Sequence, residues 1–249
     1  MKALFDKVSN DCSVKVTKAY STSFSSAVKM LAPSIRQDIY NIYGFVRFAD
    51  EQNLTDALEQ KISLKQILNS FQHTVNKYNI QQEMIDALMK SMRLDLSKSE
   101  YKTTEEYQEY IYGSADVVGL MCLKVFVNGN EEKYNELKDS AMRLGSAFQK
   151  VNFLRDLKAD FEELSRTYFP NTDLNHLDEK SKQEIIADIE SDFEAAYEGI
   201  KNLPLEAKFG VYTAYRYYKK LLKKLQKTPS LEIKNTRIRV SDYQKVELL

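Results

Sequence analysis

The sequence has few of the residues that interrupt helices or build special sites. Its 249 residues include only 7 glycines and 4 prolines, which is few for a β-rich or loop-rich protein. There is no tryptophan, and the only two cysteines, Cys12 and Cys122, are too widely spaced to form a disulfide framework. His73 and His176 have no metal-ligating neighbours, so a zinc site is not indicated. Together these shortages favour an all-helical protein that works in a reducing compartment.

The charge balance and the hydrophobic runs exclude further classes. Lysine plus arginine and aspartate plus glutamate both number 36, so the formal net charge is zero and no nucleic-acid partner is indicated. Residues 1–7 lack the apolar core of a signal peptide, and the longest apolar run, Val117 to Val127, is too short to span a bilayer. No glycine-rich phosphate loop follows a strand. The sequence therefore predicts a cytoplasmic protein, although an apolar substrate could bring it to a membrane surface.

Helix-forming segments with regular apolar spacing fill most of the chain. Apolar residues make up 43% of the sequence, and 16 tyrosines with 12 phenylalanines are enough to fill a core or line an apolar pocket. Apolar periodicity and capping signals predict helices over residues 4–28, 35–51, 62–78, 81–98, from 103 onward, 131–163, 178–201 and 205–226. No linker rich in Pro, Gly or Ser divides them, so we expect one all-α domain over residues 1–249.

The most informative stretch is residues 149–163, which contains no Gly or Pro. At about 100° per residue, one narrow side of this helix carries oxygen-bearing side chains, whereas the other side is apolar. The polar stripe consists of Gln149, Asn152, Asp156, Asp160 and Glu163, and the apolar side of Phe148, Val151, Leu154, Leu157, Phe161 and Leu164. A solvated amphipathic helix would look similar. However, like charges one turn apart repel, and mixed amide and carboxylate oxygens suit a hard cation, so we interpret the stripe as a wall of a Mg²⁺–diphosphate site. Gly145, one turn earlier, is expected to leave room beside the helix.

Three other features allow both an ordinary and a functional interpretation. The hydroxyl-rich residues Ser21–Ser26 predict a capped helix junction or an anion site. Arg47 could form a structural ion pair with Glu51, one turn further on. The basic segment 234–240 is either a solvated tail or a set of cations over an anionic ligand.

In chain order, these segments resemble the squalene/phytoene synthase family. The resemblance is carried by Ser21-Thr22-Ser23-Phe24, Tyr43…Arg47…Asp50-Glu51, Tyr112-Gly113…Gly119, Asn152-x-x-Arg155-Asp156-x-x-x-Asp160 and Tyr168-Phe169-Pro170. It covers residues 21–170 and extends more weakly to Arg239. It implies a single-domain isoprenoid-synthase bundle of helices around a central apolar cavity, with two acidic motifs facing each other across its mouth.

The resemblance also implies roles for individual residues. The acidic motifs would hold two or three Mg²⁺ ions with diphosphate through Asp50, Glu51, Asn152, Asp156 and Asp160, the four carboxylates being catalytic. Substrate-binding positions would be Tyr20, Ser21, Ser23, Tyr43, Arg47, Gln149, Asn152 and Arg155.

The first acidic motif departs from the family pattern. Where the family places a second Asp four residues after Asp50, this chain has Leu54, and Asp56 lies about 240° around a continuous helix. Either half of the motif is lost, or a segment that carries the Asp is missing between Glu51 and Gln52; we favour the second interpretation.

The implied reaction is head-to-head condensation of two prenyl diphosphates through a cyclopropyl diphosphate. Our first expectation is phytoene from geranylgeranyl diphosphate, the chemistry that begins carotenoid biosynthesis. The alternative is squalene or dehydrosqualene from farnesyl diphosphate, and only squalene requires NADPH, for which no binding signature is apparent. A third possibility is a non-catalytic lipid-binding or scaffold protein with a damaged first motif.

Overall fold

The computed structural model describes residues 1–49, 65–98, 100–162, 168–170, 177–233, 235–236 and 238–239, with the side chains of 96–97 and 158–162 left aside. These residues form helices and no strand, as the sequence predicts. The helices are α1 (Lys2–Tyr20), α2 (Thr22–Lys29), α3 (Pro33–Ala49), α5 (Lys65–Tyr78), α6 (Gln82–Ser97), α7 (Thr104–Ile111), the π-helix η1 (Tyr112–Asp116), α8 (Val117–Phe126), α9 (Glu131–Glu162), α10 (Glu179–Asn202), α11 (Leu205–Lys227) and α12 (Ser230–Ile233).

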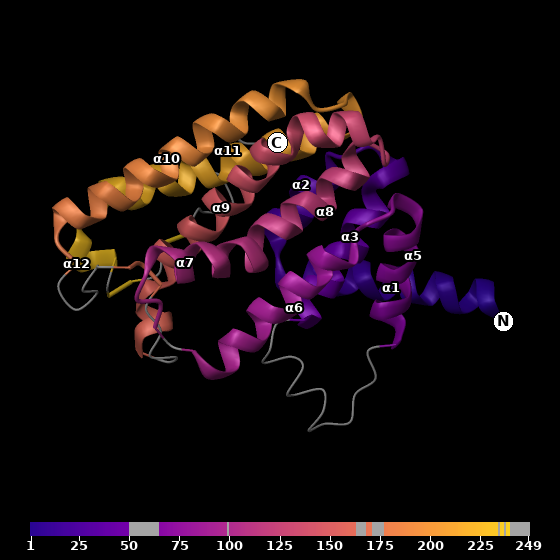
Figure 1. Ribbon diagram of the computed structural model, residues 1–249, viewed down its shortest axis with the longest axis horizontal. Coiled ribbons are helices and arrows are strands. Elements are labelled where there is room, and N and C mark those ends of the chain that lie inside the picture. Colours follow the sequence, from indigo (N-terminus) through magenta and orange to yellow (C-terminus); the bar gives the residue numbers. More distant parts are fainter. Residues whose placement is uncertain are drawn as a thin grey trace.

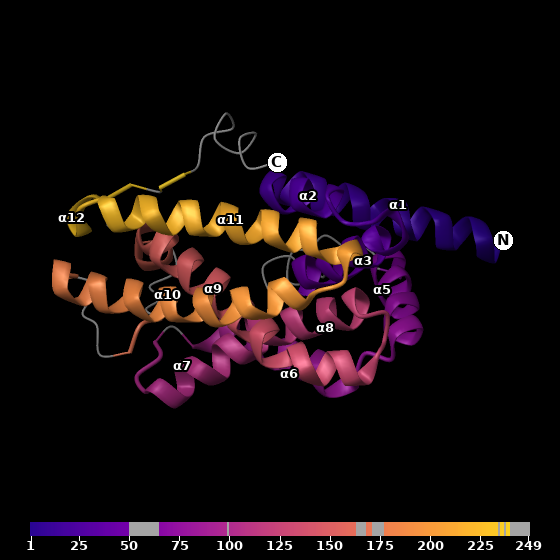
Figure 2. The ribbon, with the colours of Figure 1, turned by 90° about the horizontal axis from the view of Figure 1, so that it is seen from above.

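Helix α9 lies between the α10–α11 hairpin and the η1–α8 segment. In Figures 1 and 2 the α10–α11 hairpin runs along one side of the molecule, and α1, α3 and α5 gather at the end that carries the N-terminus. Helix α9 packs against α10, α11, α8 and η1, so it contacts both halves of the bundle. No helix among the described residues combines the length and the apolar character needed to cross a membrane.

Helix boundaries follow the capping residues of the sequence. Ser21 adopts an extended conformation between α1 and α2, and its hydroxyl accepts a hydrogen bond from the Phe24 amide at 3.2 Å. Thr103 and Asp178 cap α7 and α10 in the same way. Because each cap satisfies an amide that lacks an intrahelical partner, it fixes where the helix begins. The expected break at the hydroxyl-rich segment is thus confirmed as a capped junction.

Glycines allow three helices to approach each other closely. A Cβ atom on Gly145 of α9 would lie 2.7 Å from the carbonyl oxygen of Ala115 in η1, and one on Gly119 of α8 would lie 2.7 Å from that of Ala141 in α9. Only glycine permits such backbone approach. The room that Gly145 is expected to leave beside the helix is occupied by the backbone of η1.

The carboxyl-terminal half of α9 is held by an apolar face. Val151, Leu154 and Leu157 lie on the predicted apolar side of this helix. They are at most 5% exposed and belong to one hydrophobic core cluster. Phe153 adds a stacked contact with Tyr168, with ring centroids 3.8 Å apart. The Tyr-Phe-Pro motif at 168–170 thus packs beneath the helix that carries Asp156.

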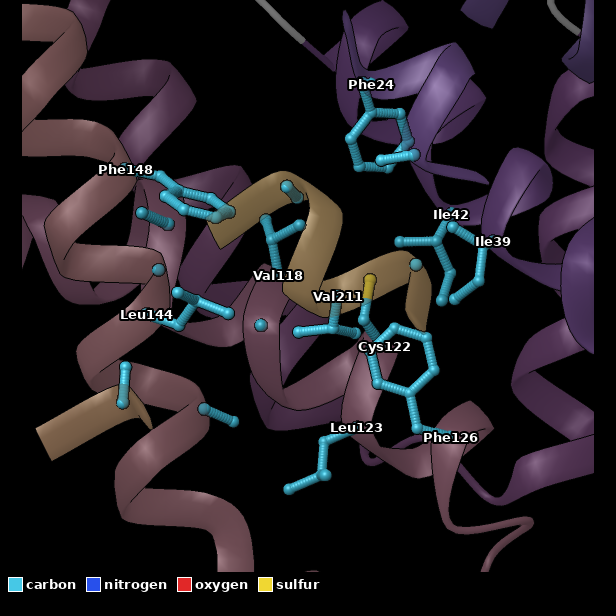
Figure 3. Close-up of a pocket in the computed structure, with 18 of the residues that line it drawn as sticks. Phe24, Ile39, Ile42, Val118, Cys122, Leu123, Phe126, Leu144, Phe148 and Val211 are labelled. Carbon is cyan, nitrogen blue, oxygen red and sulfur yellow. The ribbon is translucent and has the colours of Figure 1, made fainter. Parts of the chain in front are cut away.

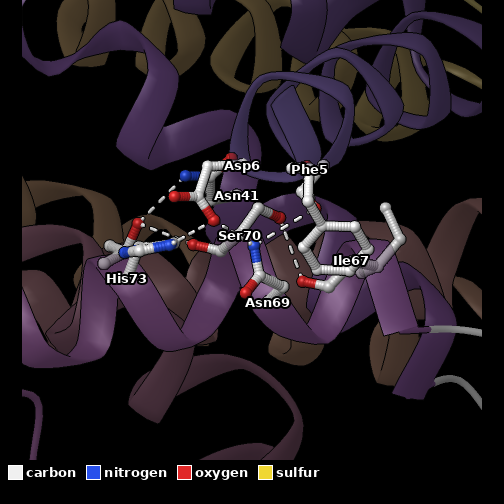
Figure 4. A network of polar contacts seen from close by, with 9 residues as sticks. Phe5, Asp6, Asn41, Ile67, Asn69, Ser70 and His73 are labelled. Carbon is white, nitrogen blue, oxygen red and sulfur yellow. Dashed lines mark hydrogen bonds and ion pairs between the residues drawn. The ribbon is translucent and has the colours of Figure 1, made fainter. Parts of the chain in front are cut away.

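Helices α1 and α5 meet along a polar seam (Figure 4). Asp6 accepts a hydrogen bond from Asn69 at 3.1 Å and pairs with His73 at 3.0 Å, and the hydroxyls of Ser13 and Ser70 lie 2.7 Å apart. The side of α1 that is fully buried is therefore made of hydroxyl-bearing residues rather than leucines. Hydrogen bonds along this seam satisfy groups that would be costly to bury alone.

A buried network of charges joins α9 to α10. Lys150 contacts Asp192 at 2.7 Å and Asp188 at 2.5 Å, and Arg143 contacts Asp192 at 2.7 Å. The Asp192 side chain is 1% exposed, whereas that of Asp188 is 59% exposed. Two cations thus neutralise a carboxylate that is fully removed from water.

We predict that Asp192→Asn lowers the free energy of unfolding by about 3 kcal/mol, because it removes the buried counter-charge of Lys150, whose side chain is 11% exposed. The matched variant Asp188→Asn removes the exposed partner of the same lysine and is expected to cost less than about 1 kcal/mol. Urea unfolding followed by circular dichroism measures both. Equal losses in the two variants would contradict the importance of burial here.

Candidate functional site

An apolar cavity of about 290 Å³ lies at the centre of the helices. Its walls come from α2, α3, η1, α8, α9, α10 and α11, and Figure 3 shows its lining of aliphatic and aromatic side chains. Phe24 of α2, Phe148 of α9 and Phe126 of α8 are its phenylalanines. A cavity with these walls is suited to an extended hydrocarbon.

Helix α9 forms the longest wall of the cavity. Its lining residues run from Leu137 to Asn152, which corresponds to about 22 Å along the helix axis. At the Asn152 end the lining turns polar, because the Gln149 amide donates to the Ser114 hydroxyl at 3.4 Å and Asn152 accepts from Tyr218 at 3.3 Å. The cavity is therefore apolar over most of its length and polar at one end.

Asp156 follows Asn152 by one turn of α9, beyond the polar end of the cavity. Arg155 holds the Asp156 carboxylate through two hydrogen bonds, from Nε at 3.0 Å and from a terminal guanidinium nitrogen. Burial alone would lower the pKa of Arg155, but the bond with Asp156 outweighs it and the pKa is raised. The pair is ionic, so a charged group adjoins the polar end of an apolar cavity.

The amino-terminal candidates approach the same cavity from α2 and α3. Tyr43 lines the cavity and stacks on Phe24 with ring centroids 4.4 Å apart. One turn later, the Arg47 guanidinium lies over the Tyr20 ring at 4.4 Å. Ser21 uses its hydroxyl as a helix cap, and Ser23 is half-buried in the first turn of α2. The structure thus brings Tyr43, Gln149 and Asn152 together around one cavity.

Several predicted ligands lie outside the described residues. Asp50 and Glu51, together with Leu54 and Asp56, fall in the segment 50–64, and the side chain of Asp160 is also outside the description although its backbone continues α9. Within the described part of the chain, no group of three His, Cys, Asp or Glu side chains could hold a metal ion. Of the magnesium ligands expected on α9, the structure describes the side chains of Asn152 and Asp156.

Tyr218 and Phe148 belong to the site although the sequence did not single them out. Tyr218 of α11 bonds to Asn152, and its ring stacks on Phe148 at 4.0 Å. Burial raises the pKa of Tyr218, so its hydroxyl stays protonated and donates. Phe148 was placed on the apolar side of α9, opposite the stripe, but it lines the cavity beside Gln149. The many tyrosines of α11 were the sequence feature that could have pointed to Tyr218.

Two half-buried acids, Cys122 and Asp116, have pKa values raised by the low polarity around the cavity. The Cys122 thiol lines the cavity, and burial raises its pKa to about 12. Asp116 lies in η1, next to the lining residue Ala115, and accepts a hydrogen bond from Ser146 at 2.7 Å. Burial raises the pKa of Asp116 to about 6, and nearby Asp192 adds to the shift.

Comparisons with known proteins agree with this geometry. The family model described as Squalene/phytoene synthase matches residues 17–244. The chain is 27% identical over 252 residues to the 15-cis-phytoene synthase of Synechocystis sp., covering 84% of this chain and 74% of that protein. It is 28% identical over 190 residues to the presqualene diphosphate synthase of Zymomonas mobilis, covering 68% of this chain and 63% of that protein.

The fold is shared with solved structures. A dehydrosqualene synthase crystallised with a ligand superposes with a TM-score of 0.79 at 21% identity, and the match covers 98% of this chain and 94% of that one. At this identity the likeness concerns the fold alone. It agrees with the predicted all-helical architecture around a central cavity.

We predict that Asp116→Asn stabilises the protein at neutral pH but not in acid. The folded carboxyl has a pKa of about 6, against roughly 3.9 when unfolded, so ionising it costs up to about 3 kcal/mol above pH 6 and nothing below pH 4. The stability advantage of the variant over the wild type should therefore appear as pH rises from 4 to 6.

Urea unfolding at pH 4.5 and 7.5 measures this difference. Asp139→Asn, an exposed position on α9, is the control and should behave like the wild type at both pH values. A constant difference between Asp116→Asn and the wild type across this range would contradict the assigned pKa.

Proposed function

Because this chain belongs to the squalene/phytoene synthase family, we propose that it condenses two molecules of geranylgeranyl diphosphate head to head to phytoene. Family members are prenyltransferases, and the relatives named phytoene synthase support head-to-head condensation of prenyl diphosphates. The choice of the C20 substrate, the cyclopropyl diphosphate intermediate and a place in carotenoid biosynthesis are our proposals.

One observation carries the proposal more than any other. The apolar cavity ends at Gln149 and Asn152, and the charged residues Arg155 and Asp156 follow within one turn on the same helix. A prenyl diphosphate has the matching polarity, with a hydrocarbon tail at one end and a highly charged group at the other. The tail would lie along α9, and the diphosphate would lie at its carboxyl-terminal half.

The residues present fit a hard divalent cation in type. The family uses a divalent metal ion with its diphosphate substrates, and carboxylate and amide oxygens are the ligands that Mg²⁺ prefers. We propose Asn152 and Asp156 as ligands from α9, to be completed by Asp160, Asp50 and Glu51. When bound, the metal would neutralise the diphosphate and improve it as a leaving group.

The side chains around the cavity would handle the cation left after diphosphate departs. Arg155 and Arg47 are placed to add hydrogen bonds to phosphate oxygens. The rings of Phe24, Tyr43 and Phe148 offer π faces that stabilise positive charge, and the apolar walls exclude the water that would quench it. Tyr20, Ser21, Ser23 and Gln149 would border the diphosphate.

Two alternatives remain distinct from this proposal. A squalene or dehydrosqualene synthase would use farnesyl diphosphate in the same cavity, and the resemblance in fold to a dehydrosqualene synthase favours considering it. A non-catalytic lipid-binding or scaffold protein would explain the departure at Leu54. Sequencing the gene between the codons of Glu51 and Gln52 tests the missing-segment interpretation, since an intact gene without a further Asp codon would favour the non-catalytic role.

The deciding experiment is product analysis. Purified protein is incubated with Mg²⁺ and labelled farnesyl or geranylgeranyl diphosphate, with and without NADPH, and the hydrocarbons are extracted. We expect labelled phytoene from geranylgeranyl diphosphate without NADPH. Asp156→Asn should reduce turnover by roughly 100-fold or more, because a charge that acts on the leaving group is lost.

Asp139→Asn is the matched control, since Asp139 lies on the exposed side of the same helix, and it should keep wild-type turnover. A C30 product from farnesyl diphosphate would select the first alternative. Substrate binding without any hydrocarbon product would select the non-catalytic role.

We also propose that an anionic membrane is the surface at which the apolar product leaves. One side of α11 is exposed along its length and changes from apolar to cationic. It consists of Leu205, Phe209 and Tyr212, of which the first two are 69% and 60% exposed, followed by exposed Arg216, Lys223 and Lys227. The opposite side of α11 lines the cavity through Gly210 and Val211. Apolar side chains beside cations are typical of helices that lie in a membrane interface.

Co-sedimentation with phosphatidylglycerol/phosphatidylcholine vesicles tests the membrane contact. We expect binding that weakens with salt, and at least about fivefold weaker binding after Leu205→Ser with Phe209→Ser, because buried apolar area drives insertion. Leu68→Ser, a 50% exposed leucine on α5, is the control. Unchanged binding of the α11 variant would refute this surface.

A further inference from the structure

A second hollow lies against the end of the central cavity that is remote from Asp156. It has a volume of about 460 Å³ and is lined by the first turns of α3, α9 and α11, the last turns of α5 and α8, and the turn that joins α8 to α9. Its lining mixes polar residues, including Ser34, Lys77, Asn130 and Lys133, with apolar ones such as Val125 and Val127, whereas the central cavity is lined almost entirely by apolar groups. Among the residues that the structure describes, Phe126 alone lines both this hollow and the central cavity.

Phe126 occupies the far end of the cavity wall. On α8, Val118, Cys122 and Phe126 follow at intervals of four residues, so they line the cavity in succession. Helix α8 packs against α9, whose lining runs from Asn152 at the polar end to Leu137 at the other. Figure 3 shows Phe126 and Leu123 on one side of the cavity, and Phe24 and Phe148 on the other.

The turn after Phe126 fixes the position of its ring. Asn128 and Gly129 have positive φ angles of 51° and 72°, and the Gly129 amide donates to the Lys124 carbonyl at 2.9 Å. The Lys124 side chain is fully buried, lies over the Tyr134 ring at 4.1 Å and pairs with Glu131 at 2.6 Å. These contacts join the last turn of α8 to the first turn of α9, so the backbone that carries Phe126 is held in place.

We infer that Phe126 is the plug that ends the hydrocarbon cavity, sets the longest prenyl tail it accepts and keeps the water of the outer hollow out of it. The tail-length part of this inference rests on the proposed function. The water-exclusion part does not, because it follows from the position of one aromatic ring between the apolar cavity and an outer hollow that contains polar groups.

Cys122 provides a probe of the plug that needs no catalysis. It precedes Phe126 by one helical turn and faces the cavity, and the high pKa of its thiol makes it slow to react. In Phe126→Ala we expect iodoacetamide to label Cys122 about tenfold faster, because the reagent and water enter from the outer hollow. Mass-spectrometric peptide mapping separates it from Cys12, a half-buried thiol on α1 that serves as the internal reference.

Substrate selection tests the tail-length part. Turnover is measured with farnesyl, geranylgeranyl and geranylfarnesyl diphosphate. In Phe126→Ala, kcat/KM for the diphosphate one isoprene unit longer than the one preferred by the wild type should rise at least roughly tenfold relative to the preferred one. Phe126→Leu, which keeps much of the bulk, should give a smaller change in both readouts.

The control is Phe71→Leu, paired with Phe126→Leu. Phe71 is buried and stacks on Phe45 at 3.9 Å, but it lines neither hollow. The Phe71→Leu variant should leave both Cys122 labelling and the preferred tail length at wild-type values. Faster labelling of Cys12 would show that Phe126→Ala does not fold. In that case the same two measurements are made on Phe126→Leu.

The outcomes separate this inference from the proposed function. If the wild type yields no condensation product, the proposed function fails, and Cys122 labelling still decides the plug. If the wild type is active but Phe126 variants change neither labelling nor tail preference, the plug is refuted and the proposed function stands.

Discussion

The architecture depends on the close backbone approach of η1, α8 and α9. Contacts at Gly145 and Gly119 bring two helices against α9 at distances that any side chain would prevent. Elsewhere along the same helices, the lining side chains point into a cavity instead of into each other. Backbone contact at two points and side chains directed into a cavity elsewhere therefore occur along the same helices.

Polarity along α9 orders the site from one end to the other. The helix presents cavity-lining residues over its middle, hydrogen-bonding amides at Gln149 and Asn152, and an ionic pair at Arg155 and Asp156. On its other sides the same helix is fixed by the buried charges of Lys150 and Asp192 and by the apolar contacts of Leu154 and Leu157. A single helix therefore sets the distance between the ionic pair and the apolar cavity.

The sequence predicted what local chemistry controls. Capping signals at the hydroxyl-rich segment around Ser21 and at Thr103, with the apolar period of each segment, placed the helices within a few residues of their observed ends. Features that depend on contacts between distant segments were missed. The π-helix η1, the bond from Tyr218 to Asn152 and the cavity position of Phe148 all arise from packing between helices far apart in sequence. The extent of the domain, residues 1–249, and the metal-binding roles stay predictions.

The polar seam between α1 and α5 has a consequence for how the molecule comes apart. The fully buried side chains of α1 are Ser9, Ser13 and Thr17, while Leu4 and Val8 are exposed. Separating this seam exposes hydroxyls and amides that water accepts readily, together with Cys12, Val14 and Val16, which are partly buried against the core. The fully buried face of α1 thus contributes less apolar area to the core than a leucine-lined face of the same length would. Since α2 and its cavity-lining Phe24 continue directly from α1, fraying of this terminus would give a bulky hydrocarbon a way out past one edge of the bundle.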